Sequence, residues 1–438
     1  MRMREYGWLA CGGAFFFLMS WILFYQVPPT KNHQDIDSGA YVQAASFLLE
    51  DGSFERLVTT PYYGLGYPLF LAGLKKIGSN SVGFIVAIQV LLAWLVALLA
   101  WKIADNFFGR RAAWIAYVLA LTNVGLLVFA QFLLTEIVLV LLLTLFVERM
   151  ISFLGNKKLS TLVLAGFFLG LSCIVKAVAV MFVVPLVFFV SVAFWKNCSV
   201  IKNIFGLLIA FALPYGLYQV HNKVMLAPHG HSMFTVNLYG WYYPHLRAQI
   251  NGTTSDEEKI FVRQQVASQE LPAMLVHDVL AYPGKACIAL GKNWIKTLLG
   301  LYTSNVKLLI DTQFVSGGLS FFNLKGTLWQ RLWGYIAGKT AHVWIGVLGV
   351  VEAFFLLMRY ILVPCGLWVL CTRRRWVELV FVVLYLGYFI GITGHDGCAR
   401  FRLMIDVLVV VLAGGGRAVL STSWLPNVGL LKGTGKKG

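Results

Sequence analysis

The sequence predicts an all-α, polytopic membrane protein with about ten transmembrane helices. Its 438 residues are 59% hydrophobic and only 13% charged, and the mean hydropathy is +0.75. Because a soluble domain has about a quarter charged residues, a water-soluble fold could not bury this much apolar surface. Apolar stretches long enough to cross a bilayer recur along the chain, and Lys and Arg gather in the short connections between them.

The apolar stretches give the expected elements in order. The first follows a leader that contains Arg2 and Arg4, and no small-residue cleavage site comes after it, so we expect an uncleaved membrane anchor. The fifth and sixth stretches are nearly continuous and divide at Lys176. The expected spans are 8–25, 82–104, 112–129, 135–153, 159–175, 177–195, 204–219, 341–371, 377–393 and 403–420.

The net charge of +17 arises from 36 basic and 19 acidic residues. With the N-terminus in the cytoplasm, the basic residues of every short loop fall on the cytoplasmic side, as the positive-inside rule requires. Membrane topology therefore explains the charge, and no nucleic-acid partner is expected. Both termini are expected in the cytoplasm, with a bacterial inner membrane favoured over the endoplasmic reticulum. The residues concerned are Lys102, Arg110, Arg111, Arg149, Lys157, Lys158, Lys196, Lys202, Arg373, Arg374, Arg375, Lys432, Lys436 and Lys437.

We expect a single integral membrane domain over 1–438, with two long loops on the outward side. The first loop covers 26–81 and contains a segment, 37–49, whose apolar residues recur at helical spacing, as in a helix at the membrane interface. A Pro/Gly/Tyr turn at 60–68 follows it. The second loop covers 220–340, and the C-terminal membrane helices cover 341–438. Loops of this length are usually functional or contain helices of their own.

Two carboxylates, Asp35 and Asp37, stand where the first loop's helix begins. Asp at a helix start commonly accepts a hydrogen bond from an unpaired backbone N–H group. The alternative is a carboxylate held at the membrane surface as a general base or a metal ligand. Spacing alone leaves both interpretations open. It also leaves open whether a divalent metal ion binds here.

Arg400 and Arg402 lie on the outward side, against the positive-inside trend, just before the last span. Guanidinium groups beside a helix N-terminus suit a phosphate group, although snorkelling to the interface would also explain them. His395 and Asp396 lie in the same short turn, where Asp396 could pair with one of the arginines.

Lys176 and Glu136 are ionisable residues next to apolar runs. Such groups are costly in a membrane unless they are paired or hydrated, so we expect Glu136 to be functional or paired. Lys176 is either functional or an ordinary residue of an outer loop. For Glu352 and Asp406, which fall inside predicted spans, we expect structural pairing.

Several short motifs resemble those of GT-C glycosyltransferases of the protein O-mannosyltransferase and aminoarabinose transferase type. The resemblance extends over nearly the whole chain, and the motifs share one predicted side of the membrane. Departures from the family pattern occur at Ser38, at Lys176, where the family has Arg, and at Met404, where it usually has Pro. The motifs are Asp37-Ser38 with Tyr41 and Ala45, Tyr67-Pro68-Leu69-Phe70-Leu71-Ala72, Thr135-Glu136, 170–176, Asn237-Leu238-Tyr239-Gly240 and Ala399-Arg400-Phe401-Arg402-Leu403.

The resemblance implies transfer of a sugar, with inversion, from a polyprenyl-phosphate donor to a lipid, glycan or protein acceptor on the outward face. Asp37 would be the general base or would orient the acceptor, with Asp35 and Glu136 assisting. Lys176, Arg400 and Arg402 would bind the donor phosphate. Tyr41, Tyr62, Tyr63, Tyr67 and His395 would line the acceptor cleft, although an aromatic belt also explains the tyrosines.

Two other functions remain open. A transporter or flippase for a lipid-linked or anionic solute would explain the number of spans and the charges within them, but transporters place functional charges near the bilayer midplane and often contain repeats. The best candidates here cluster at the outer surface, and no internal repeat is visible. A non-catalytic assembly subunit would explain the departures from the family pattern.

Overall fold

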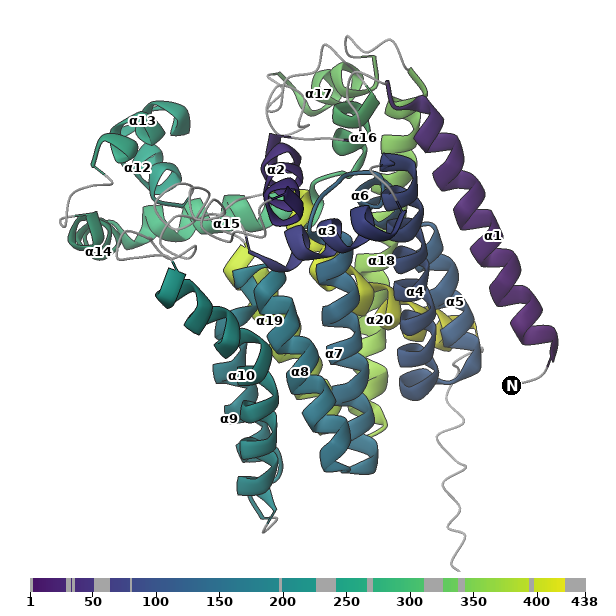
Figure 1. Ribbon diagram of the computed structural model, residues 1–438. Helices are drawn as coiled ribbons and strands as arrows, with labels where there is room; N and C mark the ends of the chain where they lie inside the picture. The colour runs from purple at the N-terminus through teal and green to yellow at the C-terminus, as the bar shows by residue number, and fades with distance from the viewer. Residues whose placement is uncertain are drawn as a thin grey trace, which may run out of the picture.

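The computed structural model describes residues 3–28, 33, 36–50, 64–78, 81–196, 199–225, 242–265, 271–310, 326–337, 343–393 and 398–421. These residues form helices and short connections, and no strand occurs among them. Long helices lie roughly side by side in a bundle, and a smaller group of helices, α12 to α15, projects from one end of it (Figure 1). The prediction of an all-α membrane protein is confirmed.

Six helices within the described residues are long and apolar enough to cross a membrane. A seventh span would arise if α14 (Leu271–Ala281) and α15 (Pro283–Leu299), which meet at a bend of 100°, are counted together. Shorter apolar helices account for three further predicted spans, namely α8 (Leu159–Val175), η2 with α9 (Ala177–Ala193) and α19 (Trp376–Thr393). The six long ones are α1 (Met3–Gln26), α4 (Val82–Phe108), α7 (Glu136–Asn156), α10 (Val200–Met225), α18 (Val343–Thr372) and α20 (Leu403–Ser421) with the preceding turn η6 (Ala399–Arg402).

The predicted continuous span 112–129 is wrong, because the structure breaks it into α5 (Arg110–Leu121) and α6 (Val124–Phe129). Two local hydrogen bonds accompany the break. The Thr122 hydroxyl donates back to the Val118 carbonyl at 2.9 Å, and the Asn123 side chain accepts from the Gly125 backbone N–H at 2.8 Å, which caps the new helix.

Glycines allow the spanning helices to pack closely. On α18, a Cβ added at Gly366 would lie 2.2 Å from the Leu412 carbonyl oxygen of α20, and one at Gly416 of α20 would lie 2.3 Å from the Leu362 carbonyl oxygen of α18. On α8, a Cβ at Gly170 would lie 2.4 Å from the Phe211 carbonyl oxygen of α10. These contacts hold α18 against α20 and α8 against α10.

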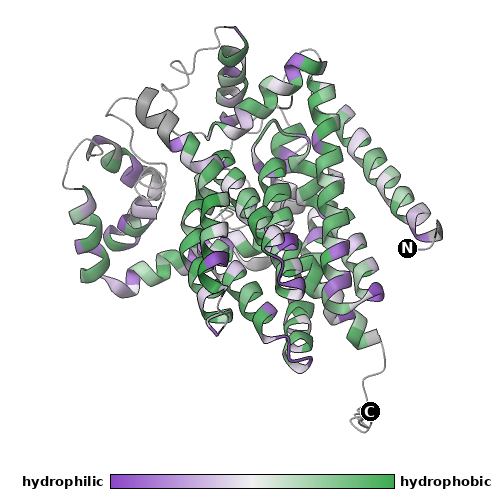
Figure 2. Ribbon diagram, turned by 60° about the horizontal axis from the view of Figure 1, so that its bottom comes forward, coloured by the Kyte–Doolittle hydropathy of each residue, from purple (hydrophilic) through white to green (hydrophobic). Residues whose placement is uncertain are grey.

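The two ends of the bundle differ in character. The basic turns at 109–111, 157–158 and 373–375 all lie at one end of the bundle (Figure 1). The long helices are largely hydrophobic along their length (Figure 2). The helices of the two long loops gather at the opposite end: α2 (Ile36–Glu50), α3 (Gly66–Gly78), α15, α16 (Thr303–Ile310) and α17 (Leu328–Ala337).

The second long loop has a small core of its own. It is formed by α12 (Tyr243–Asn251), α13 (Ser255–Gln265), α14 and α15, and it buries Tyr243, Leu246 and Val262. Polar contacts support this core: Arg247 pairs with Glu258 at 2.7 Å, and the Tyr243 hydroxyl donates to Asp278 at 2.9 Å. The expectation that this loop contains helices is therefore met.

Candidate active site

Four elements that are distant in the sequence meet at the end of the bundle opposite the basic turns. They are the first turn of α2, the first residue of α7, the junction between α8 and η2, and the turn η6. Each element contributes one charged side chain, and the four are Asp37, Glu136, Lys176 and Arg400, which we call the charge cluster. Carboxylates at the start of α2 and α7 interact favourably with the positive ends of those helices.

The break between α8 and η2 brings Lys176 into the charge cluster. Helix α8 ends at Val175, and Lys176 has extended backbone angles (φ −153°, ψ 122°) before η2 begins. The segment before α3 approaches this end closely: a Cβ at Gly64 would lie only 2.3 Å from the Ile174 carbonyl oxygen. The Lys176 Nζ donates to Glu136 Oε1 at 3.1 Å and lies 4.6 Å from the centre of the Phe401 ring.

Arg400 connects the two carboxylates of the cluster. Its Nη1 donates to Asp37 Oδ2 at 2.8 Å, and its Nε donates to Glu136 Oε1 over a short distance. Within the part of the chain that the structure describes, Arg400 Nη2 makes no hydrogen bond. The guanidinium therefore keeps a donor available for a further group.

The two carboxylates differ in their surroundings. The Glu136 side chain is 4% exposed, and its Oε1 accepts from both Lys176 and Arg400. Its Oε2 is buried and has no hydrogen-bond partner among the described residues, which is unusual for a buried oxygen. The Asp37 side chain is 35% exposed. Asp37 is thus the carboxylate accessible to a reacting group, whereas Glu136 holds the two cations together.

Tyr41 and Tyr67, two of the predicted acceptor-cleft tyrosines, are buried at 3% and 0% exposure. Their rings make an edge-to-face contact with centroids 5.2 Å apart. The Tyr67 hydroxyl donates to Gln89 Oε1 at 2.7 Å, and Gln89 Nε2 donates to the Phe132 carbonyl at 2.8 Å. Burial raises the pKa of Tyr41, and the nearby Glu136 charge raises it further. The contact between the two rings packs α2 against α3.

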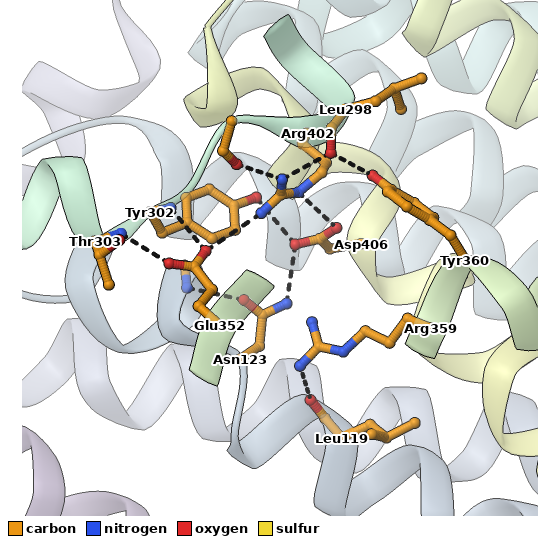
Figure 3. A network of polar contacts seen from close by, with 12 residues as sticks. Leu119, Asn123, Leu298, Tyr302, Thr303, Glu352, Arg359, Tyr360, Arg402 and Asp406 are labelled. Carbon is orange, nitrogen blue, oxygen red and sulfur yellow. Dashed lines mark hydrogen bonds and ion pairs between the residues drawn. The ribbon is translucent and has the colours of Figure 1, made fainter. Parts of the chain in front are cut away.

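Arg402, which we expected to bind phosphate beside Arg400, lies in a different environment. Its side chain is 1% exposed and contacts Glu352 at 3.6 Å and Asp406 at 3.4 Å (Figure 3). The expected structural pairing of both acidic residues is confirmed. The structure thus joins Asp37, Glu136, Lys176 and Arg400, but it does not bring Arg402 into their group.

Four predicted site residues, Asp35, Tyr62, Tyr63 and His395, lie outside the described residues. The neighbouring Asp396 and the motif 237–240 also lie outside them. Among the residues that are described, no group of three or more His, Cys, Asp or Glu side chains could hold a metal ion.

Sequence reasoning missed Gln89 and Asn123, two buried residues whose side chains form hydrogen bonds between separate elements near the site. Each is a polar residue within an apolar run, and this isolation could have identified it as a buried hydrogen-bonding partner. Gln89 links α3 to the connection before α7, and Asn123 Nδ2 donates to Asp406 Oδ2 at 2.9 Å.

Comparison with known proteins agrees with this architecture. The archaeal oligosaccharyltransferase AglB from Archaeoglobus fulgidus, in complex with an inhibitory peptide and a dolichol-phosphate, matches with a TM-score of 0.50 and 13% sequence identity, over 96% of this chain and 51% of that one. The apo form of the Archaeoglobus fulgidus oligosaccharyltransferase matches with a TM-score of 0.52 and 14% identity, over 94% and 50%. The chain therefore spans about half the length of these proteins. It shares the fold of the membrane part of these oligosaccharyltransferase structures.

The sequence adds a family match. Residues 63–216 match the model of the dolichyl-phosphate-mannose-protein mannosyltransferase family, and this segment contains Glu136 and Lys176. A structure of ArnT from Cupriavidus metallidurans in the apo state gives a TM-score of 0.43 at 16% identity, over 91% of this chain and 78% of that one. No curated protein matches the chain. The predicted resemblance to GT-C glycosyltransferases is confirmed for the fold and for this segment.

Proposed function

We propose that this protein is a membrane glycosyltransferase that moves a sugar from a polyprenyl-phosphate donor to an acceptor at the charge cluster. The observation that carries the proposal is the joining of Asp37, Glu136, Lys176 and Arg400 from four separate elements at one end of the bundle. Two cations beside an accessible carboxylate suit a reaction in which a phosphate leaves while a nucleophile loses a proton. The AglB structure with the same fold contains a dolichol-phosphate.

In the proposed reaction, an acceptor nucleophile attacks the anomeric carbon of the donor sugar and forms the new glycosidic bond. The bond from that carbon to the phosphate oxygen breaks, and the oxygen leaves with its electron pair as polyprenyl phosphate. Asp37 receives the proton of the acceptor or orients it. Attack from the face opposite the phosphate inverts the anomeric centre, as the family resemblance implies.

Arg400 and Lys176 bind the donor phosphate in this proposal. The unused Nη2 of Arg400 and the remaining N–H groups of Lys176 can each donate to a phosphate oxygen. Glu136 positions both cations and offsets their mutual repulsion. Arg402 has no part in phosphate binding, because its guanidinium is buried between Glu352, Asp406 and the carbonyl groups of the α15 end.

The proposal extends to location and domain roles. The basic turns lie at the end opposite the charge cluster, so the positive-inside rule supports a site on the periplasmic face of a bacterial inner membrane, with both termini in the cytoplasm. The loops 26–81 and 220–340 then cover the space between donor and acceptor. The sugar is a hexose or pentose, and the acceptor is a lipid, glycan or protein.

Transport of a lipid-linked solute is the rival function. Its main support was the charge inside the spans, but Glu352 and Asp406 are engaged by Arg402 and by helix ends. A liposome experiment separates the two functions. Protein reconstituted with polyprenyl-phosphate sugars and an acceptor extract should release polyprenyl phosphate, whereas a flippase would move the intact donor to the other leaflet without releasing it.

A further inference from the structure

Arg402 caps the end of a helix that belongs to the second long loop. Its Nη1 donates to the carbonyl oxygens of Leu298 at 2.9 Å and Gly300 at 2.5 Å, at the C-terminal end of α15 (Figure 3). A cation is favourable at this end, because the last carbonyl groups of a helix lack partners and point outward.

Glu352 of α18 caps the start of the next helix in the complementary way. Its two oxygens accept from the backbone N–H groups of Tyr302 at 2.7 Å and Thr303 at 2.9 Å, where α16 begins. An anion is favourable at a helix N-terminus. Since Arg402 Nη2 lies 3.6 Å from Glu352 Oε1, one ion pair caps both of the helix ends that meet at residues 300–302.

Further contacts fix this connector against the turn η6. The Arg402 guanidinium lies 4.3 Å from the centre of the Tyr302 ring, and the Tyr302 hydroxyl donates to Asp406 at 2.9 Å. A Cβ at Gly300 would lie 2.9 Å from the Cβ of Ala399, the first residue of η6. The connector and the turn are therefore packed directly on each other.

The same turn carries Arg400 of the charge cluster, two residues from Arg402. In this one short turn, Arg400 reaches α2 and α7, whereas Arg402 reaches α15 and α18. Buried ionic groups are often no more stabilising than apolar residues of similar size, but they can specify a unique arrangement. The arrangement specified here is the position of the turn.

We propose that Arg402 is a positioning residue: by fixing η6 against the junction of α15 and α16, it holds Arg400 in place for the donor phosphate. The consequence for the donor rests on the proposed function, whereas the fixing of the turn does not. The second long loop and the phosphate-binding arginine then behave as one unit, so that disturbing the connector weakens donor binding.

The test compares Arg402→Lys with a matched control. Lys keeps the charge but loses the fork that reaches the two carbonyl groups through Nη1 and Glu352 through Nη2. Arg359→Lys removes another buried guanidinium of the same region, whose Nη2 donates to the Leu119 carbonyl of α5 at 3.1 Å and not to the connector. The full-length protein in nanodiscs is used for two measurements: hydrogen exchange of the backbone amides of residues 399–402, and the KM and kcat for a polyprenyl-phosphate sugar. Arg400→Ala serves as the reference for loss of the phosphate contact.

For Arg402→Lys we expect exchange of the turn amides about tenfold faster and a donor KM about tenfold higher, with kcat changed less. Arg359→Lys should change neither quantity, even where it lowers the melting temperature equally. Unchanged exchange in Arg402→Lys would overturn the inference. So would a raised exchange rate with unchanged KM, provided that Arg400→Ala raises KM.

A separate outcome concerns the proposed function alone. An unchanged donor KM in Arg400→Ala would overturn the phosphate site, and the exchange measurement would then decide whether Arg402 fixes the turn. If Arg402→Lys fails to fold, Glu352→Gln tests the same connector, because it removes the charge and one of the two acceptors at the start of α16. The same faster exchange is expected.

Discussion

The Nη1 of Arg400 donates to Oδ2 of Asp37 at 2.8 Å, and this hydrogen bond joins residues that are 363 positions apart in the sequence. It connects the first turn of α2 to the turn before the last helix. Through Glu136, the same guanidinium is also connected to Lys176. The charge cluster is therefore a product of the tertiary fold, and each of its members can be tested separately.

The first prediction separates catalysis from stability on one helix. Helix α7 carries two buried glutamates: Glu136 in the charge cluster, and Glu148, which pairs with Lys102 at 2.8 Å and with Arg149 at 2.5 Å. Glu136→Gln removes a counter-charge of the buried Lys176 and Arg400, so this variant should lose about 3 kcal/mol of unfolding free energy. Glu148→Gln should lose less, because the side chains of Lys102 and Arg149 are 49% and 30% exposed. Only Glu136→Gln should also lose transfer activity. Equal activities of the two folded variants would contradict this role for Glu136.

The second prediction concerns Lys176, where the family pattern has Arg. Lys176→Met removes one charged hydrogen-bond donor from the phosphate, so the donor KM should rise about tenfold. Lys176→Arg keeps the charge and offers a forked donor set, so its KM should stay near that of the wild type. Initial rates over a range of donor concentrations measure both. Equal KM values for the Met and Arg variants would exclude Lys176 from donor binding.

The third prediction concerns the contact that shapes the junction at Lys176. Gly64→Ala places a Cβ against the Ile174 carbonyl oxygen, so α3 or the end of α8 must move, and activity should fall. Gly73→Ala in α3 is the matched control, because its Cβ would meet nothing within 4 Å. That variant should gain about 0.5–1 kcal/mol of stability, since Ala is favoured over Gly within helices. An active Gly64→Ala variant would show that the junction tolerates displacement.

The fourth prediction uses pH and Tyr41. Burial and the Glu136 charge raise the pKa of Tyr41 above its ordinary value. The stabilising contribution of the neutral phenol is thus fully present below about pH 10 and is lost as pH rises beyond it, because only the unfolded chain ionises readily. Unfolding free energies measured between about pH 9 and pH 11 should fall more steeply in the wild type than in Tyr41→Phe. Parallel slopes would contradict the assignment.

The helices were largely predictable from the sequence, because apolar length and the placement of basic residues depend on each segment alone. The break at Lys176 was predictable for the same reason. The break at Asn123 was not, since the Asn123 side chain also donates to Asp406, 283 positions later. Whether a polar residue interrupts a helix there depends on a partner that the local pattern does not reveal.

The four residues of the charge cluster could be predicted from the sequence, but the different environments of Arg400 and Arg402 could not. Asp37, Glu136, Lys176 and Arg400 were all candidates, and the structure brings them together. Arg402 and Arg400 are the same residue type in the same motif before the last span, so the sequence predicted the same role for both. A 3₁₀ turn has about three residues per turn, so residues two apart point to different sides, and the sequence could not indicate which arginine faces Asp37.

The most direct test of the account is release of polyprenyl phosphate by the purified protein in nanodiscs, followed by mass spectrometry. The protein is supplied with polyprenyl-phosphate sugars and a membrane acceptor extract, and Asp37→Asn is compared with Glu50→Gln, an exposed position at the other end of α2. We predict release that requires the acceptor, is lost in Asp37→Asn and is kept in Glu50→Gln, with both variants folded. Undiminished release by Asp37→Asn, or no release from any donor by the wild type, would contradict the proposed mechanism.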